Sequence, residues 1–282
     1  MNYKMLKCGI TGHSGTLGSQ LIKGKFNFKF IKFKENICNK KKLQQWIKKN
    51  NLDLIIHLAA IVPTWVVERD FPYANKVNYI GTKNVIDAII ENNLNLKWFF
   101  FASTSHVYSF PKKKIKINER FKKKTISKYG LTKLRAENYI KKKLSKSKIP
   151  YCIGRIFSFT HKNQEDSFLI PSIVKKIRKS KNKNIVFNNM NHYRDFVSVS
   201  DICEAIKLLW GKKNKGEFNI ASGKATNIKN IAKFVCKKYK KKSIFIDNGK
   251  SYLVGDINKI KKLGWQSKKN TFQILNEYLA MT

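Results

Sequence analysis

Two side chains that could move a proton lie one helical turn apart in the segment YGLTK, at Tyr129 and Lys133. A tyrosine phenol, with its ordinary pKa of about 10, is a poor acid or base near neutrality. A lysine ammonium on the same helix face stabilises the phenolate and brings that pKa toward working pH. Thr104, just after an apolar run, would hold a carbonyl or alcohol oxygen beside them. The three residues predict a Tyr-dependent acid/base site, although ordinary helices also carry tyrosine and lysine at this spacing.

A glycine-rich loop follows the first apolar run of the chain, in TGHSGTLG at 11–18. Glycines at this spacing, between a strand and a helix, suit a tight turn, close backbone approach to a pyrophosphate, and tight helix packing. The pattern predicts a dinucleotide site, although loops use glycine for other reasons. His13 could contact phosphate or be a solvent-exposed loop residue. The candidate cofactor-binding residues of this loop are Gly12, His13, Ser14, Gly15, Thr16, Leu17 and Gly18.

The residues after the second expected strand leave the cofactor open between NAD and NADP. Glu35 lies about where an acidic residue would bind the adenosine ribose of NAD. Lys32 and Lys34 beside it would favour the extra phosphate of NADP. In so lysine-rich a chain, two lysines do not decide the choice.

These residues need a scaffold, and the alternation of short apolar runs with longer amphipathic segments predicts βαβ units on a parallel sheet. We expect strands at 6–10, 28–34, 52–58, 98–102, 151–157 and 217–220, and helices near 16–22, 40–49, 73–92, 127–144 and 201–210. Asp201, with Glu204 three residues later, predicts a capped helix start. The fold class is α/β, a Rossmann-type doubly wound sheet over residues 1–157. A smaller substrate-binding lobe follows over 158–282, of which about 192–222 returns to the first domain.

The formal charge of +42 arises from 59 Lys and Arg against 17 Asp and Glu. Only six of these cations are arginines, and the 53 lysines are dispersed in short runs. A nucleic-acid reader would use arginine for bidentate contacts. We therefore exclude nucleic acid as the leading partner and expect the charge to attract anionic small molecules in a salt-sensitive way.

The remaining whole-chain features concern the membrane, the cellular location and the cysteines. No apolar run approaches the ~20 residues of a membrane helix, and no signal peptide is visible, so we expect a cytoplasmic protein without a membrane partner. The five cysteines are isolated from one another and show no metal spacing, and His161 and His192 have no ligand-spaced partners. We expect free thiols and no metal.

Taken together in order, the motifs resemble the extended short-chain dehydrogenase/reductase family, the group of NAD-dependent nucleotide-sugar epimerases, dehydratases and reductases. The resemblance covers nearly the whole chain. It rests on TGHSGTLG at 11–18, IIHLAA at 55–60, VNYIGTKNV at 77–85, FFFASTSHVY at 99–108, YGLTK at 129–133, RDFVSVSD at 194–201, FNIASGKATNIKNIA at 218–232 and DINKIKKLGW at 256–265.

This resemblance implies roles for further residues. Thr104, Tyr129 and Lys133 would form the catalytic triad, and Arg194 would pair with the diphosphate of a nucleotide sugar. Asn78 would help to organise the site. Further cofactor-binding candidates are Leu58, Ala59, Ala60, Asn78 and Phe157, and the substrate-binding candidates are Thr64, Ser105, His106, Arg155, Ser158 and Arg194. Arg155 and Arg194 could each instead be a structural ion-pair partner.

Departures from the family pattern narrow the expected reaction. The family's dehydratases carry an acidic pair after the triad hydroxyl, where this chain has Ser105 and His106. Ser158 replaces the family's usual asparagine, which puts substrate contacts there in doubt. The shortened second and third strands resemble compact 4-keto-sugar reductases. We expect an NAD(P)-dependent reductase of a nucleotide-activated 4-keto(-6-deoxy) sugar, and the resemblance implies a homodimer. The alternatives are a nucleotide-sugar 4-epimerase and a non-catalytic nucleotide-binding protein of the same fold.

Overall fold

The structure is a computed structural model that describes residues 5–24, 26–92 and 94–282. The chain divides into two compact units. Unit 1 comprises Met1–Ser109, Lys122–Ile156 and Cys203–Phe218, and unit 2 comprises Phe110–Phe121, Phe157–Ile202 and Asn219–Thr282. The segment that rejoins unit 1 is thus narrower than the expected 192–222, and a short segment before residue 122 belongs to unit 2.

A six-stranded sheet organises unit 1, in the order β2-β1-β3-β4-β5-β8. The four pairings from β2 through β5 are parallel, which confirms the predicted doubly wound α/β class. Strand order reverses between β1 and β3, so the loops after these two strands leave the same edge at a switch point. The strands are β1 (Leu6–Thr11), β2 (Phe28–Lys32), β3 (Leu54–His57), β4 (Trp98–Thr104), β5 (Tyr151–Ile156) and β8 (Gly216–Ile220).

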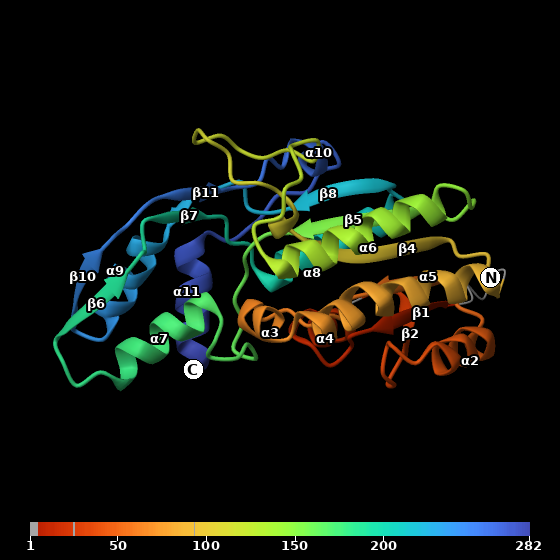
Figure 1. Cartoon of the computed structure of the whole chain (residues 1–282), viewed down its shortest axis with the longest axis horizontal. Helices are drawn as coiled ribbons and strands as arrows, with labels where there is room; N and C mark the ends of the chain where they lie inside the picture. The colour runs from red at the N-terminus through yellow and green to blue at the C-terminus, as the bar shows by residue number, and fades with distance from the viewer. Residues whose placement is uncertain (1–4, 25, 93) are drawn as a thin grey trace. The chain divides into compact units, whose positions relative to one another are not determined.

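Helices cover the sheet because its strands are apolar on both faces. Phe99 and Phe101 of β4 pack in one buried cluster with α2 (Lys40–Asn50), α5 (Gly81–Glu91) and α6 (Lys128–Leu144), and Figure 1 shows α5 and α6 running across that face. Trp98 points the other way and meets Trp210 of α8 (Val199–Gly211), with ring centroids 5.9 Å apart. Helix α1 (Thr16–Lys23) follows the glycine loop. No helix among the described residues is long and apolar enough to cross a membrane.

The helix expected over 73–92 is interrupted. α4 (Phe71–Asn75) runs into a π-helical turn, η1 (Lys76–Ile80), before α5 begins, and α3 (Thr64–Arg69) precedes it. The wider turn contains Asn78, whose side chain bonds both backbone polar groups of Ile61. π-turns inside helices are frequent at functional sites.

The predicted cap at Asp201 is wrong. α8 already begins at Val199, and the Ser198 hydroxyl accepts the backbone N–H of Asp201 at 3.0 Å. The Asp201 carboxylate instead accepts the Ser267 hydroxyl and two backbone N–H groups of the following residues. An acidic side chain in the first helical turn therefore looked like a cap, while a serine three residues earlier makes the capping bond.

Unit 2 has its own core, formed by α7, α9 and α11 with the sheet of β6 and β10, and it also holds a small three-stranded sheet. The β6 and β10 strands pair in parallel, and β7 pairs with β11 in parallel and with β9 antiparallel. The remaining elements are η2 (Ser105–Val107) in unit 1 and α7 (Leu169–Lys179), β6 (Asn184–Asn188), β7 (His192–Arg194), β9 (Thr226–Asn227), α9 (Ile228–Lys238), β10 (Lys242–Ile246), β11 (Ser251–Leu253), α10 (Asn258–Lys261) and α11 (Thr271–Met281) in unit 2.

Candidate active site

The glycine loop joins β1 to α1 at the switch point, and its three glycines meet different surroundings. Gly12 has φ +70°, and a Cβ there would lie 2.6 Å from the Ala59 nitrogen. A Cβ on Gly18 would collide with the Gly12 carbonyl. A Cβ on Gly15 would meet nothing nearer than 3.5 Å, and Gly15 begins α1 without a side-chain cap. Gly12 and Gly18 are required by the fold, whereas Gly15 leaves an uncapped helix N-terminus open.

The other predicted residues of this loop are spread between core and surface. The His13 ring lies 3.1 Å from the Phe33 carbonyl oxygen, so its Nδ1 can tie the glycine loop to the segment after β2. Ser14 is exposed, Thr16 is half-buried, and the Leu17 side chain is buried. Because the Leu17 side chain is buried, Leu17 could contact a ligand only through its backbone.

The loop after β3 lies beside the glycine loop. The Leu58 N–H donates to the Thr11 carbonyl at 3.2 Å, and Leu58, Ala59 and Ala60 are half-buried. Asn78 fixes the continuation of this loop, since its carboxamide accepts from Ile61 N at 2.7 Å and donates to Ile61 O at 2.9 Å. Asn78 is fully buried with both polar atoms used. Its polar atoms thus bind the loop after β3 and Thr132, and its contact with a cofactor stays a prediction.

The structure brings Thr104 and Tyr129 together. Thr104 ends β4, and Tyr129 stands in the first turn of α6, whose N-cap is Ser127. The Thr104 hydroxyl is close enough to the Tyr129 phenol to oppose the rise in its pKa, and both side chains are buried apart from a few per cent of their surface. Lys133 lies one turn further along the same helix face. Its Nζ stands 4.1 Å from the centre of the Phe101 ring.

Burial dominates the electrostatics of these groups. It raises the pKa of the Tyr129 phenol, and the hydrogen bond from Thr104 opposes that shift. Burial lowers the pKa of Lys133 to about 7, while the negative charge of Glu137 opposes that change. Within the part of the chain that the structure describes, Lys133 Nζ makes no hydrogen bond or ion pair. A buried ammonium in this state favours an incoming polar partner.

His106 packs against Tyr129, the predicted acid. Its ring meets that of Tyr129 edge to face at 5.9 Å, and its Nδ1 lies 3.0 Å from the Ser127 hydroxyl. Ser105 is buried, while Thr64 is exposed at the start of α3. Of these three substrate-binding candidates, His106 is the one placed beside Tyr129 by contacts in the structure.

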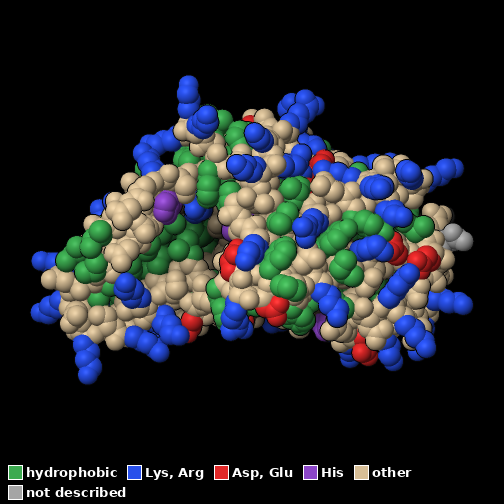
Figure 2. All heavy atoms as spheres, viewed as in Figure 1, with side chains coloured by type: hydrophobic (Ala, Val, Ile, Leu, Met, Phe, Trp, Pro, Cys, Tyr) green, Lys and Arg blue, Asp and Glu red, His purple; other side chains and the backbone are tan. Residues whose placement is uncertain are grey.

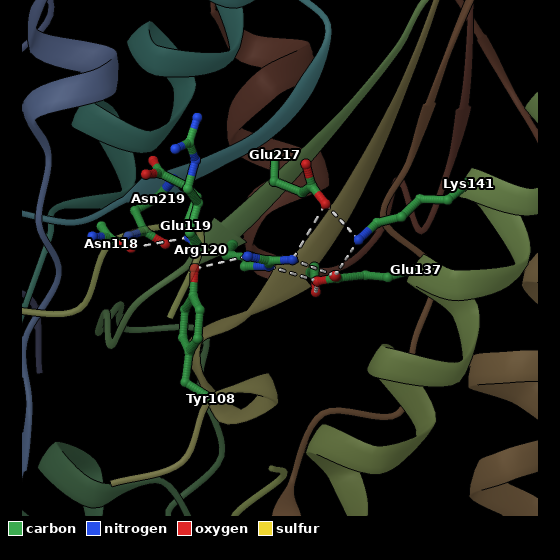
Figure 3. A network of polar contacts seen from close by, with 10 residues as sticks. Tyr108, Asn118, Glu119, Arg120, Glu137, Lys141, Glu217 and Asn219 are labelled. Atoms are coloured by element: carbon green, nitrogen blue, oxygen red, sulfur yellow. Dashed lines mark hydrogen bonds and ion pairs between the residues drawn. The ribbon is translucent and has the colours of Figure 1, made fainter. Parts of the chain in front are cut away.

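Arg155 requires a correction. Its guanidinium donates to both carboxylate oxygens of Glu137, at 3.0 and 2.7 Å, and to the Tyr108 hydroxyl at 2.9 Å. Figure 3 shows Glu137, Lys141, Glu217 and Tyr108 gathered in this network. With no exposed surface, the Arg155 side chain has no room for a substrate contact. It is a structural ion-pair partner, the alternative that the sequence left open.

The remaining candidates belong to unit 2. Arg194 donates from Nη1 to Tyr193 O at 2.9 Å and to the Ser251 hydroxyl at 3.0 Å, and lies over the Phe110 ring. No carboxylate pairs with it among the described residues, and burial lowers its pKa to about 10. Phe157 is buried, and the Ser158 carbonyl accepts the Val197 N–H at 2.9 Å. Arg194 is thus a cation without a counter-ion among the residues that the structure describes.

A family model matches nearly the whole chain. The family model described as GDP-mannose 4,6 dehydratase matches residues 11–278 of the 282. The chain belongs to this family of extended short-chain dehydrogenases/reductases. The match spans the glycine loop, the three residues of the predicted triad and Arg194, and it confirms the family that the motifs resemble.

Curated relatives and solved structures of related fold carry several names. The chain is 29% identical over 239 residues to GDP-6-deoxy-D-talose 4-dehydrogenase of Aggregatibacter actinomycetemcomitans, covering 82% of this chain and 79% of the relative. It is 25% identical over 296 residues to an ADP-L-glycero-D-manno-heptose-6-epimerase of Brachyspira hyodysenteriae, covering 91% of each. The structure of RMD from Pseudomonas aeruginosa complexed with NADPH superposes with a TM-score of 0.86 at 20% identity, covering 97% of this chain and 98% of that one.

Sequence reasoning missed two buried polar residues near the candidate site, His57 and Glu137. His57 lies between the hydroxyls of Thr11 and Thr82, and Glu137 lies one turn beyond Lys133. The signal for Glu137 was available, because it continues the four-residue spacing of Tyr129 and Lys133 on one helix face. His57 had no such signal: it interrupted an apolar strand, and its partners are distant in sequence.

Proposed function

We propose that this protein is an NAD(P)-dependent oxidoreductase that reduces the keto group of a nucleotide-activated 4-keto sugar, such as a 4-keto-6-deoxy sugar. The observation that carries the proposal is the placement of Thr104 at the carboxyl end of β4 and of Tyr129 in the first turn of α6. Lys133 follows one turn along α6 and makes no ion pair with any residue that the structure describes. This is an acid with an oxygen-holding neighbour and a cation that can stabilise its conjugate base.

The residues at the switch point fit a dinucleotide. Gly15 leaves the α1 N-terminus uncapped for a pyrophosphate, and Lys133 offers ammonium protons that no described residue accepts. Gly12 through Gly18, with Leu58, Ala59 and Ala60, would hold the cofactor, and Phe157 remains a proposed contact. A nicotinamide cofactor, when bound, supplies the hydride. NAD and NADP both remain candidates, since Lys32, Lys34 and Glu35 are all exposed.

Tyr129 then acts as the acid of the reduction. Its phenol donates a proton to the substrate oxygen as the keto carbon becomes an alcohol, and Thr104 holds that oxygen in line. In this proposal the Lys133 ammonium, one helical turn away, stabilises the phenolate that remains. The chain contributes alignment and electrostatics to the reaction.

The family model is described as a dehydratase, but this description does not establish that the present chain dehydrates a sugar. A 4,6-dehydration needs an acid and a base to remove water from the sugar, and the family's dehydratases place carboxylates after the triad hydroxyl. This chain has Ser105 and His106 there. The residues therefore support reduction over dehydration.

The substrate class is inferred from a charge and from the relatives. Arg194 has no carboxylate partner among the described residues, so its guanidinium suits a diphosphate. The relatives named above are, by name, a dehydrogenase and an epimerase of nucleotide-linked sugars. Thr64, Ser105, His106 and Ser158 are proposed sugar contacts.

The test is oxidation of NADH or NADPH with a panel of nucleotide 4-keto-6-deoxy sugars, comparing wild type with Tyr129→Phe. We expect kcat/KM to fall by roughly 10²–10⁴ because the acid is lost. Tyr139→Phe is the matched control, since Tyr139 is on the same helix but bonds Asp87. Equal turnover by wild type and Tyr129→Phe would refute the catalytic proposal, and no turnover with direct cofactor binding would favour the non-catalytic alternative.

A 4-epimerase is the second candidate function. A putative UDP-glucose 4-epimerase of Methanocaldococcus jannaschii is 26% identical over 234 residues, covering 80% of this chain and 75% of that protein. An epimerase would retain its cofactor through purification and show no net oxidation of added NAD(P)H. The same triad would serve both reactions.

A homodimer and a cytoplasmic location complete the proposal. Tyr73 and Ile80, on the segment that leads into α5, are 50% and 36% exposed, which suits burial against a second copy. Light scattering should report twice the 32.9 kDa of one chain, and a mass of one chain would contradict it.

A further inference from the structure

A fully buried histidine lies beneath the candidate active site with both ring nitrogens in use. His57, the last residue of β3, has its Nδ1 2.6 Å from the Thr11 hydroxyl and its Nε2 2.8 Å from the Thr82 hydroxyl. Its ring stacks on Phe101, at 5.6 Å between centroids. The catalytic roles proposed above do not use this residue.

The neighbouring bonds fix which nitrogen carries the proton. The Thr82 hydroxyl donates to the Asn78 carbonyl at 2.7 Å, so it accepts from His57 Nε2–H. Nδ1 is then unprotonated and accepts from the Thr11 hydroxyl, which itself accepts the Ala59 N–H at 3.4 Å. Burial, reinforced by the positive charge of Lys133, lowers the pKa of His57 to about 3 and keeps the ring neutral.

The bonds continue in one direction from the cofactor loops to the catalytic helix. They run from Ala59 through Thr11, His57 and Thr82 to the Asn78 carbonyl. The Asn78 side chain in turn donates to the Thr132 hydroxyl at 3.1 Å, and Thr132 donates to the carbonyl of Tyr129 at 2.8 Å. The end of β1, the loop after β3, the π-turn and α6 are thereby joined by buried polar groups, each satisfied by the next.

We propose that His57 is a positioning residue that holds the cofactor loops in register with the helix that carries Tyr129. It acts as a neutral Nε2–H tautomer bridging Thr11 and Thr82. The inference rests on the proposed function, because the loops that it joins are those assigned there to the dinucleotide. A purely space-filling histidine would need no defined tautomer and no hydroxyl at either neighbour.

The first test is the nitrogen NMR spectrum of ring-labelled protein, which has only five histidines. His57, assigned by its loss in His57→Phe or by through-bond correlation, should show a protonated Nε2 and an acceptor Nδ1 that do not titrate between pH 5 and 8. Thr82→Val should perturb the Nε2 resonance and Thr11→Val the Nδ1 resonance. A His57 signal that titrates in this range, or shows the opposite tautomer, would overturn the proposal.

The second test measures direct binding of NADH and NADPH to folded wild type and to variants of the two threonines. Thr82→Val and Thr11→Val should each weaken binding about tenfold, because a buried partner is left unsatisfied. The double variant should be little weaker than either single one, since both break the same chain of bonds. Thr82→Ser keeps the hydroxyl and should bind like wild type.

The outcomes separate this inference from the proposed function. Wild type that binds neither cofactor would refute the proposed function and the positioning role with it. Wild type that binds while both valine variants bind equally well, or lose affinity additively, would refute the positioning role of His57 alone.

Discussion

Lys133 is placed where its charge is useful for chemistry and unfavourable for folding. Its side chain is 2% exposed, and burial lowers its pKa to about 7 from the ordinary 10.5. The folded protein therefore releases the lysine proton more easily than the unfolded chain does. Such a group destabilises the folded state below its folded pKa, and the cost fades as pH rises.

Because the buried Lys133 charge destabilises the folded state, we predict that Lys133→Met inactivates the enzyme and raises the free energy of unfolding near neutral pH. Between pH 7 and 10.5 the unfolded wild type binds more protons, so wild-type stability rises relative to the variant, by up to about 1.4 kcal/mol per pH unit. Urea unfolding of both proteins across this range measures it. A stability difference independent of pH would contradict the assignment.

At the residue scale, the placement of the proposed reacting groups was easier to predict from the sequence than the placement of the residues that support them. Thr104, Tyr129 and Lys133 were predictable because a helix places residues four apart on one face and strand ends carry ligands. Arg155 was misassigned to substrate because an isolated arginine in a sequence does not reveal its partner. That partner, Glu137, becomes visible only when α6 packs on β5.

At the scale of elements, the buried pair of Glu137 and Arg155 joins α6 to β5, and Ser103 of β4 adds a hydroxyl bond at 2.5 Å. Removing one partner leaves an uncompensated buried charge, at a cost of roughly 3–5 kcal/mol. We predict that Arg155→Met lowers the free energy of unfolding by about 3 kcal/mol. The double variant with Glu137→Leu should lose less than the sum of the two single changes.

Denaturant unfolding measures these losses of stability. The KM for the nucleotide sugar tests separately whether Arg155 contacts the substrate. If Arg155→Met were as stable as wild type but raised KM for the nucleotide sugar, Arg155 would be a substrate ligand after all. The structural assignment would then be wrong.

The glycine loop gives a matched pair of variants within one element. Gly15→Ala meets no atom nearer than 3.5 Å, so it should cost about 1 kcal/mol or less in stability while weakening NAD(P)H binding at least tenfold. Gly18→Ala forces a side chain onto the Gly12 carbonyl and should cost about 3 kcal/mol. Thermal unfolding and direct cofactor titration separate the two effects. Unchanged cofactor binding by Gly15→Ala would argue against a pyrophosphate at this helix end.

The presence of most helices and strands of unit 1 could be predicted from the sequence. The π-turn within a helix and the residue at which α8 begins could not. Period-two and period-3.6 patterns are local, so the strands and helices of unit 1 were predictable from them. The π-turn at Asn78 depends on a bond to Ile61, which is distant in sequence. The start of α8 depended on whether Ser198 or Asp201 makes the capping bond, and both residue types are good caps.

At the scale of the whole molecule, the charge of +42 is a background that acts on all anionic ligands alike. Figure 2 shows lysine and arginine side chains spread over the visible face without a single patch. Such a field raises the local concentration of anions and is screened by salt. The specific contacts proposed here come instead from single cations such as Lys133 and Arg194.

We therefore predict that raising salt from about 50 to 500 mM weakens binding of both cofactor and nucleotide sugar while kcat changes little, because screening acts mainly on exposed charges. Steady-state kinetics at several salt concentrations measures this effect. The same profile with Arg194→Gln should show a raised KM for the sugar and an unchanged cofactor affinity. A salt-independent KM would show that the surface charge has no part in binding.

The central claim is net reduction of a sugar keto carbon with Tyr129 as the acid. Transfer of deuterium from NADH or NADPH labelled at nicotinamide C4 to a nucleotide 4-keto-6-deoxy sugar tests it most directly. We predict one carbon-bound deuterium in the product for each cofactor oxidised, at a rate that collapses in Tyr129→Phe and persists in Tyr139→Phe. Turnover of the sugar without deuterium transfer, or transfer unaffected by Tyr129→Phe, would contradict the account.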